Sequence, residues 1–288
     1  MMDIEPLDGA RMRAMVQGAL EEDGARADVT VALLALGDRP AVGEIAVDAP
    51  VRVCGVEVAR EVFGRVDASC TFEAAHQDGD HAGAGAVICR VSGRAASILA
   101  AERTALNFLQ RMTGVATLAA RYVDAVRGTG AVILDTRKTI PLWRDLDKYA
   151  VRCGGAHNHR RALDAMVLIK DNHVRALGGV DVLKQTLARV PRDRFIEVEV
   201  DSIDFLKSML DAPVHRIMLD NFTPVQVEEA MAQVRAFQDA HGRRPEIEVS
   251  GGVTLETVRD YARAGVDFIS VGAITHSAAA ASMSLSLR

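Results

Sequence analysis

The sequence predicts an α/β protein whose larger part folds as a parallel (β/α)₈-type barrel, either complete or lacking one or two strands. Short apolar runs recur after residue 112, helical stretches separate them, and successive runs begin 22 to 34 residues apart. This alternation is typical of repeated βα units, whose strands form a parallel sheet. The runs are AVILDTRK (131–138), AMVLIKDN (165–172), RFIEVEVD (194–201), RIMLDN (216–221), EIEVSGG (246–252) and FISVGAI (268–274). A doubly wound open sheet is the alternative, and it is disfavoured because no GxGxxG motif follows the first strand.

The first third of the chain mixes helices and strands. Residues 9–21 have the apolar spacing of a helix, and residues 43–48 and 86–91 have the composition of strands. Residues 51–66, between those strands, predict a helix that is entered through a glycine. This part of the chain therefore lacks the regular βα alternation that follows it.

Residues 94–112 predict a long amphipathic helix with an apolar stripe that includes Ile98 and Leu109. At about 100° per residue, Arg103 lies roughly 140° from Ile98 and therefore off that stripe. The Arg103 side chain is thus free to meet solvent, a ligand or another subunit.

Composition and charge exclude several classes of protein. The net charge of −5 disfavours nonspecific binding to nucleic acid or to an anionic membrane. No apolar run approaches the roughly 18–20 residues of a membrane-spanning helix, and the first residues include acids where a signal peptide would be basic. The four cysteines form no CxxC pair, which disfavours a zinc ribbon or a redox pair. We therefore expect a cytoplasmic protein that binds neither nucleic acid nor membranes.

Polar residues follow the apolar runs at the points where the strands should end. In a parallel barrel the carboxyl ends of all strands lie at one face, so side chains far apart in sequence converge there. These residues are Asp135, Thr136, Arg137, Lys138, Lys170, Asp171, Asn172, Glu197, Glu199, Asp201, Asp220, Asn221, Ser250, Gly251, Gly252 and Gly272. Their succession on six strands predicts one functional site.

The residue types at these strand ends favour a polyanionic substrate. Residues 137–161 hold seven Lys or Arg against two acids, in a chain whose total charge is negative. Such a cluster suits phosphates or several carboxylates. Glu199 and Asp220, on consecutive strands, offer the oxygen ligands that Mg²⁺ prefers beside phosphates. Glycines after the last two strands let backbone N–H groups approach an anion closely.

The pair His157 and His159 has two of the nitrogen ligands that a zinc site would need. No third nitrogen or sulfur ligand lies nearby in the sequence, so hydrogen bonding to anionic oxygens beside Arg160 fits the pair better.

Eight short motifs occur together in one order along the chain. They are ERTALNFLQRMTG (102–114), DTRKT (135–139), KYAVRCGG (148–155), NHR (158–160), LIKDNH (168–173), EVEV (197–200), LDN (219–221) and SGG (250–252). Together they resemble the quinolinate phosphoribosyltransferase family from about residue 17 to residue 277. Each motif alone carries little information, whereas eight in order are highly specific.

The resemblance implies a two-domain subunit. Residues 1–111 would form an N-terminal α/β sandwich that residues 276–288 return to complete, and residues 112–275 would form an incomplete α/β barrel. It also implies a homodimer in which Arg103 reaches the partner's site and helps to bind the carboxylates of quinolinate.

The resemblance further implies a reaction and a role for each site residue. The family transfers phosphoribose from phosphoribosyl pyrophosphate to quinolinate, with decarboxylation, and gives nicotinate mononucleotide for NAD biosynthesis. Lys138, Lys170, Glu199 and Asp220 match the residues expected to be catalytic, and the last two match the acids near Mg²⁺ and the ribose. Residues matching those that bind substrate carboxylates and phosphates are Thr136, Arg137, Lys138, His159, Arg160, Lys170, Ser250, Gly251, Gly252 and Gly272.

The chain departs from the family pattern after two of its motifs. DTRKT continues as IPLWR, so Leu142 stands where the pattern has glycine and Trp143 follows it. After NHR the chain reads RALDA, with Arg161 and Ala162 at positions that are apolar and glycine in many members. A leucine in place of a glycine changes both backbone freedom and side-chain volume.

Other functions remain as alternatives. A related phosphoribosyltransferase could accept a different aromatic or heterocyclic acid. A Schiff-base aldolase could use Lys170 at its strand end, but the surrounding anion-binding residues would then lack a purpose. A catalytically silent binding protein is disfavoured because every cation and acid needed for turnover is present.

Overall fold

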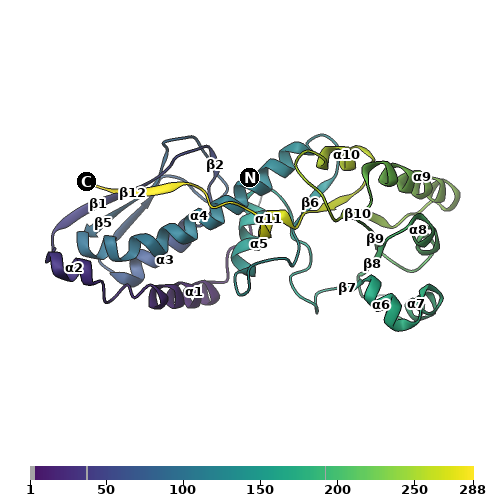
Figure 1. Cartoon of the computed structure of the whole chain (residues 1–288), viewed down its shortest axis with the longest axis horizontal. Coiled ribbons are helices and arrows are strands. Elements are labelled where there is room, and N and C mark those ends of the chain that lie inside the picture. The colour runs from purple at the N-terminus through teal and green to yellow at the C-terminus, as the bar shows by residue number, and fades with distance from the viewer. Residues whose placement is uncertain (1–3, 37, 192) are drawn as a thin grey trace. The chain divides into compact units, whose positions relative to one another are not determined.

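The structure, a computed structural model, describes residues 4–36, 38–191 and 193–288. The chain divides into two compact units, shown in Figure 1. The first comprises Met1–Ala120, Ile140–Gly155 and Ser277–Arg288, and the second comprises Arg121–Thr139 and Ala156–His276. The domain boundary that we expected after residue 111 lies within one continuous helix, and residues 140–155 belong to the first unit.

The first unit contains a four-stranded antiparallel sheet in the order β12-β1-β5-β3. Its strands are β1 (Pro40–Val47), β3 (Thr71–Ala74), β5 (Val87–Arg94) and β12 (Met283–Leu287). The pairing of β12 with β1 runs from Gly43 opposite Leu287 to Val47 opposite Met283. The C-terminal tail therefore completes the N-terminal sheet, as the resemblance implied. A short ribbon pairs β2 (Val51–Arg52) with β4 (His81–Ala82).

The first unit also contains helices. They are α1 (Gly9–Glu22), α2 (Val29–Leu34), α3 (Val56–Val66), α4 (Ala95–Ala125) and α5 (Arg144–Cys153). Asp8 and Asp28 cap the first two through their carboxylates, which accept from free backbone N–H groups. α3 contacts β3 and β5 and buries Val58, Val62 and Phe63, so its apolar face forms part of this unit's core.

Close packing of α4 against the tail makes Gly114 a sensitive position. A Cβ atom on Gly114 would lie 2.0 Å from the carbonyl oxygen of Ala279, and this backbone cannot yield as a flexible side chain would. We expect Gly114→Ala to lower the free energy of unfolding by about 2–3 kcal/mol, because the tail must be displaced.

The matched control is Gly64→Ala in α3, where an added Cβ meets no atom within 4 Å. Alanine favours a helix over glycine, so this change should leave stability equal or up to about 1 kcal/mol higher. Urea denaturation of both variants measures the difference. Equal stability of the two variants would contradict the packing argument.

The second unit contains a six-stranded parallel sheet in the order β6-β11-β10-β9-β8-β7. Its strands are β6 (Val132–Leu134), β7 (Val167–Ile169), β8 (Ile196–Val200), β9 (Arg216–Asp220), β10 (Glu246–Ser250) and β11 (Phe268–Ser270). Each lies within one of the six apolar runs, which confirms the predicted parallel α/β architecture. In the described part of the chain β6 and β7 are the end strands of this sheet, and no pairing between the two is found.

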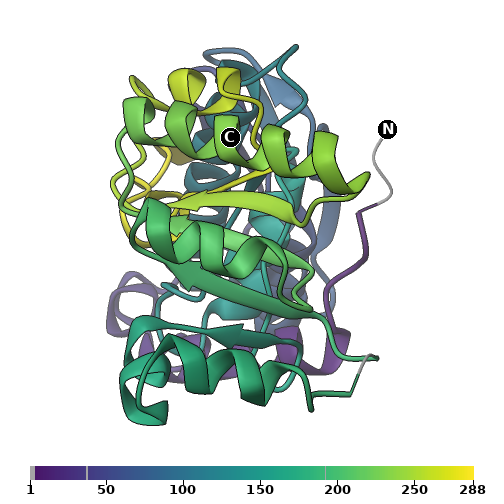
Figure 2. The ribbon, with the colours of Figure 1, turned by 90° about the vertical axis from the view of Figure 1, so that its right-hand side faces the viewer.

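Helices follow the strands and lie against the sheet, as Figure 2 shows for the helices after β8 and β9. They are α6 (Asp171–Leu177), α7 (Val180–Leu187), α8 (Ile203–Leu210), α9 (Pro224–His241), α10 (Val258–Arg263) and α11 (Ala273–His276). α9 begins with a capping box between Thr223 and Gln226 and has Pro224 in its first turn. These start signals fix where each strand ends and hence which side chains stand at the carboxyl edge. No helix in the described ranges is both long and apolar enough to cross a bilayer.

Candidate active site

A cavity of about 490 Å³ lies at the carboxyl ends of the parallel strands of the second unit. Every strand of the sheet, or the segment that follows it, contributes to the wall. The lining residues are Thr136, Arg137, Lys138, His159, Arg160, Leu168, Lys170, Glu199, Met218, Asp220, Asn221, Ser250, Gly251 and Ser270. Of the sixteen strand-end residues named from the sequence, nine line this one cavity, together with His159 and Arg160.

Three of the residues to which the resemblance assigns a role do not line this cavity. Gly272 is adjacent to it, because a Cβ on Gly272 would lie 3.1 Å from Cδ of Lys138. Gly252 follows the lining residue Gly251 and has a positive φ of 64°. Arg103 lies on α4 in the first unit, where its side chain is exposed as the helical pattern predicted.

Asp135 holds the segment that carries His159. Its side chain is fully buried and accepts hydrogen bonds from the backbone N–H of His159 and from Nδ2 of Asn158, both at 2.8 Å. The backbone N–H of Asp135 in turn donates to the carbonyl of His157. Asp135, which follows β6, therefore has a structural role: it holds residues 157–159 beside the strand.

Cations crowd one side of the cavity. Burial and the like charge of Arg137 lower the pKa of the Arg160 guanidinium. Arg160 also donates from Nη1 to the carbonyl of Met166, which fixes its direction. Two arginines held this close gain favourable interactions when an anion binds between or beside them.

Acids stand opposite, at the ends of β8 and β9. Lys170 forms an ion pair with Oε2 of Glu199, and Asp220 accepts a hydrogen bond of 2.7 Å from Nδ2 of Asn221. Glu199 is largely buried, whereas Lys170 is 44% exposed and can reach a ligand. Two carboxylates on consecutive strands are a hard-oxygen donor set of the kind that suits Mg²⁺ beside phosphate oxygens.

The turn after β10 requires glycine. Gly251 has a φ of +93°, and a Cβ there would lie 2.2 Å from Oδ1 of Asn221. The bare backbone at Gly251 therefore comes close to the Asp220–Asn221 turn, where N–H groups can face an anion. The strand-end residues named from the sequence include both Gly251 and Asn221, and Asn221 has a φ of +59° and helps to form the wall.

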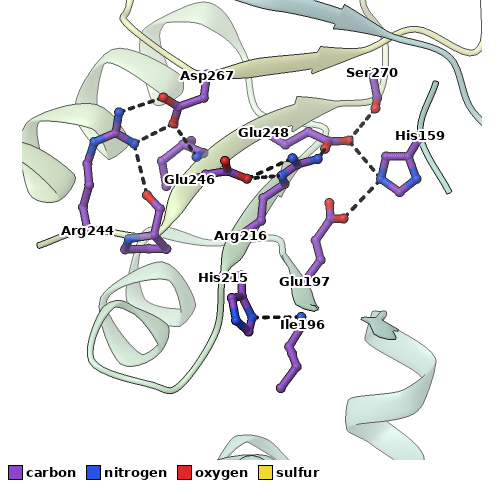
Figure 3. Close-up of polar contacts among 12 residues, drawn as sticks. His159, Ile196, Glu197, His215, Arg216, Arg244, Glu246, Glu248, Asp267 and Ser270 are labelled. Atoms are coloured by element: carbon purple, nitrogen blue, oxygen red, sulfur yellow. Dashed lines mark hydrogen bonds and ion pairs between the residues drawn. The ribbon is translucent and has the colours of Figure 1, made fainter. Parts of the chain in front are cut away.

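Two buried glutamates lie beside His159, and of the two only Glu248 was absent from the residues singled out in the sequence. Nε2 of His159 is 3.1 Å from Oε2 of Glu197 and 3.6 Å from Oε1 of Glu248, as Figure 3 shows. Burial raises the pKa of both carboxyl groups to about 7. The position of Glu248 could have been read from the sequence, because Glu248 precedes Ser250 by two residues on one strand and therefore points to the same face.

Comparison with known proteins decides the family. The model of the quinolinate phosphoribosyl transferase C-terminal domain matches residues 115–286, and that of the N-terminal domain matches residues 28–113. The chain belongs to the quinolinate phosphoribosyl transferase family. The two matched ranges cover both units, so the relationship extends to helix α4, which carries Arg103, as well as to the cavity.

Individual members of the family are similar over almost the whole chain. Nicotinate-nucleotide pyrophosphorylase [carboxylating] of Mycobacterium leprae is 40% identical, over 92% of this chain and 93% of that protein. A protein of Methanocaldococcus jannaschii described as a probable nicotinate-nucleotide pyrophosphorylase [carboxylating] is 36% identical, over 95% and 96% of the two chains. The structure of the Francisella tularensis nicotinate-nucleotide pyrophosphorylase matches with a TM-score of 0.91 at 34% identity, over 100% of both chains.

The departure from the family pattern at Leu142 keeps the backbone of a glycine. Leu142 has a φ of +67°, in the left-handed region that glycine adopts freely, and its side chain is 93% exposed. The next residue, Trp143, stacks on Phe108 with ring centroids 5.1 Å apart. Both residues line a cavity of about 800 Å³ within the first unit. The substitution therefore alters the surface of that unit and preserves the turn.

Leu142→Gly should raise the free energy of unfolding by about 0.5–1 kcal/mol. A left-handed residue with a Cβ costs about 1–2 kcal/mol, and the extra freedom of glycine in the unfolded chain offsets part of the gain. Leu142→Ala is the control, since it keeps the Cβ and should stay within about 0.5 kcal/mol of the wild type. Chemical denaturation measures the free energy of unfolding of both variants. If Leu142→Ala were stabilised and Leu142→Gly were not, the backbone explanation would be refuted.

Proposed function

We propose that this protein transfers phosphoribose from phosphoribosyl pyrophosphate to quinolinate and decarboxylates the product to nicotinate mononucleotide. The observation that carries the proposal is the cavity itself, which joins a cationic side and a pair of carboxylates at the carboxyl ends of six parallel strands. The names of the similar proteins and the family membership support the same reaction. An aromatic dicarboxylate and a triply phosphorylated sugar are the kinds of ligand that this charge distribution suits.

The cationic side would bind anions of both substrates. Arg137, Lys138 and Arg160 lie together on the wall, and an anion would relieve the repulsion that lowers the pKa of Arg160. Ser250 and the backbone at Gly251 and Gly252 would hold the 5′-phosphate, because N–H groups can approach its oxygens where no Cβ intervenes. Gly272, beside Lys138, would extend this phosphate site.

The acidic side would hold the ribose and Mg²⁺. Glu199 and Asp220 would supply carboxylate oxygens to the ion, and Lys170 would keep Glu199 oriented through their ion pair. When bound, Mg²⁺ would neutralise charge on the departing pyrophosphate. As the leaving group departs, positive charge develops on the sugar, and the same carboxylates would stabilise it by electrostatic attraction.

The bond changes need little proton transfer from the protein. The bond from C1 of the ribose to the pyrophosphate oxygen breaks with its electron pair on oxygen, and the lone pair of the pyridine nitrogen forms the new bond to C1. The resulting pyridinium accepts the electron pair of the bond to the C2 carboxylate, which leaves as CO₂, and a proton takes its place at C2. Positioning of the two substrates and fixed charges would supply most of the rate enhancement.

We also infer that the protein works as a cytoplasmic homodimer in which Arg103 reaches the partner's site. The support is the family resemblance and the exposure of Arg103 on α4, away from the apolar stripe of that helix. Analytical ultracentrifugation at micromolar concentration should find a dimer, and a monomer at the same concentration would contradict this part of the proposal.

A substrate panel tests the proposed function against its nearest alternative, a relative that accepts another aromatic acid. Purified protein is incubated with phosphoribosyl pyrophosphate, Mg²⁺ and either quinolinate, nicotinic acid or other pyridine carboxylates, and pyrophosphate release is followed. We expect turnover with quinolinate alone. Turnover with a different acid and none with quinolinate would keep the fold and the transfer chemistry but move the function to the alternative.

A further inference from the structure

Glu248 lies at the centre of a buried polar cluster that no predicted role explains. Its side chain is fully buried on β10, two residues before Ser250 at the cavity wall. A buried carboxylate is costly unless its oxygens are hydrogen-bonded or paired with charge. Both oxygens of Glu248 have such partners, which come from three different strands or segments.

Arg216 and Ser270 anchor the Glu248 carboxylate. Nη1 of Arg216, at the start of β9, donates to Oε2 at 2.9 Å, and the hydroxyl of Ser270, at the end of β11, donates to Oε1. Arg216 is itself held by Glu246, to which Nε and Nη2 donate at 3.0 and 2.9 Å. The guanidinium also lies 3.8 Å from the ring centroid of Phe268. The carboxylate is therefore fixed from both sides.

His159 is the residue toward which this anchored carboxylate points (Figure 3). Nε2 of His159 lies 3.6 Å from Oε1 of Glu248 and 3.1 Å from Oε2 of Glu197, while Asp135 holds the backbone of His159. The imidazole is 94% buried but contributes to the cavity wall. A carboxylate oxygen accepts a hydrogen bond, so a hydrogen on Nε2 can be donated to Glu197, while the 3.6 Å contact places Oε1 of Glu248 beside the same nitrogen and helps to hold the ring.

We propose that Glu248, anchored by Arg216 and Ser270, is a positioning residue that fixes the imidazole of His159 for binding of the aromatic acid. The inference rests on the proposed function for the identity of that acid. His159 precedes Arg160 on the cationic side of the cavity, so a rotated ring would disturb the carboxylate site more than the phosphate site. Loss of Glu248 should therefore raise the KM for quinolinate and leave the KM for phosphoribosyl pyrophosphate nearly unchanged.

Glu248→Gln and Glu246→Gln form a matched pair for the test. Both glutamates lie on β10 and both bind Arg216, but among the contacts described only Glu248 also faces His159. We expect Glu248→Gln to raise the KM for quinolinate about tenfold, whereas Glu246→Gln should stay within about twofold of the wild type. Ser270→Ala removes one hydrogen bond to Glu248 without changing the charge. It should raise the KM for quinolinate by less than Glu248→Gln does.

A double-mutant cycle separates positioning from general damage. If Glu248 acts through His159, the variant that combines Glu248→Gln with His159→Ala should be no worse than His159→Ala alone. The proposal would be overturned if the increases in the KM for quinolinate caused by Glu248→Gln and His159→Ala multiplied in the double variant. It would also be overturned if Glu248→Gln and Glu246→Gln raised this KM equally. Thermal melting of each variant shows whether loss of folding contributes.

A second readout does not depend on turnover. In protein labelled with ¹⁵N-histidine, the ring nitrogens of His159 are assigned by comparison with His159→Gln. Their ¹⁵N chemical shifts should differ from the wild-type values in Glu248→Gln and should equal the wild-type values in Glu246→Gln. Unchanged shifts in both variants would refute positioning by Glu248 even in an active enzyme. Changed shifts in a protein that fails to turn over quinolinate would uphold the positioning and reject the proposed function alone.

Discussion

Replacement of Lys170 by alanine should lower kcat/KM about a thousandfold. Lys170 is the cation that pairs with Glu199, and its half-exposed amine can reach a bound anion. The change leaves the nearly buried Glu199 carboxylate without its charged partner and removes a fixed positive charge from the site of pyrophosphate departure. Loss of a preorganised electrostatic group of this kind typically costs about two to three orders of magnitude. Steady-state kinetics with quinolinate and phosphoribosyl pyrophosphate measure it.

Lys170→Arg distinguishes this role from Schiff-base chemistry. Arginine keeps the charge but cannot form an imine, so an electrostatic role predicts a smaller loss, about tenfold, because the fork geometry of the new side chain differs. Lys184→Ala, at an exposed site on α7, is the control for removal of a lysine and should be neutral. Equal inactivation by alanine and arginine, together with borohydride trapping of a carbonyl substrate, would favour the aldolase alternative.

Asp220→Asn should lower kcat/KM for phosphoribosyl pyrophosphate about a hundredfold and raise the Mg²⁺ concentration needed for half-maximal rate. Asparagine keeps the size of the side chain and an oxygen that can accept from Asn221, but it removes the negative charge. A hard divalent cation and a cationic sugar both interact far more strongly with a carboxylate than with an amide. Rates measured across a Mg²⁺ titration separate weaker metal binding from slower chemistry.

Asp260→Asn provides the control for Asp220→Asn. Asp260 is an exposed acid on α10 whose 3.8 Å contact with Arg263 lies within the helix, so its loss should change neither parameter. If Asp220→Asn matched this control in its Mg²⁺ and phosphoribosyl pyrophosphate dependence, Asp220 would have no part in holding the metal or the ribose.

The parallel sheet was predictable because the sequence patterns that indicate it are local. Each strand is an apolar run, and the regular spacing of the runs identifies the βα repeat without knowledge of any long-range contact. Strand β12 is different, since Met283–Leu287 carries no local feature that names β1 as its partner. Only the resemblance placed the tail in the first sheet. The inclusion of residues 140–155 in the first unit was likewise invisible, because periodicity does not report which core a helix joins.

The cavity was predictable from the rule that carboxyl ends of parallel strands converge. That rule identifies residues at strand ends, such as Lys170 and Asp220, but it overlooks side chains one layer below. Glu248 is in that layer, and the two-residue period of a strand would have placed it on the face of Ser250. Arg216 could not be found in this way, because it lies at the start of its strand and contacts Glu248 only because its side chain is long.

The most direct test of the account is the stoichiometry of the reaction in the wild-type protein. Quinolinate labelled with ¹⁴C in its 2-carboxylate is incubated with Mg²⁺, with and without phosphoribosyl pyrophosphate, and the released CO₂, pyrophosphate and nicotinate mononucleotide are measured together. We expect equal amounts of the three products and no CO₂ without phosphoribosyl pyrophosphate. Pyrophosphate release without loss of the label, or loss of the label without the phosphoribosyl donor, would contradict it.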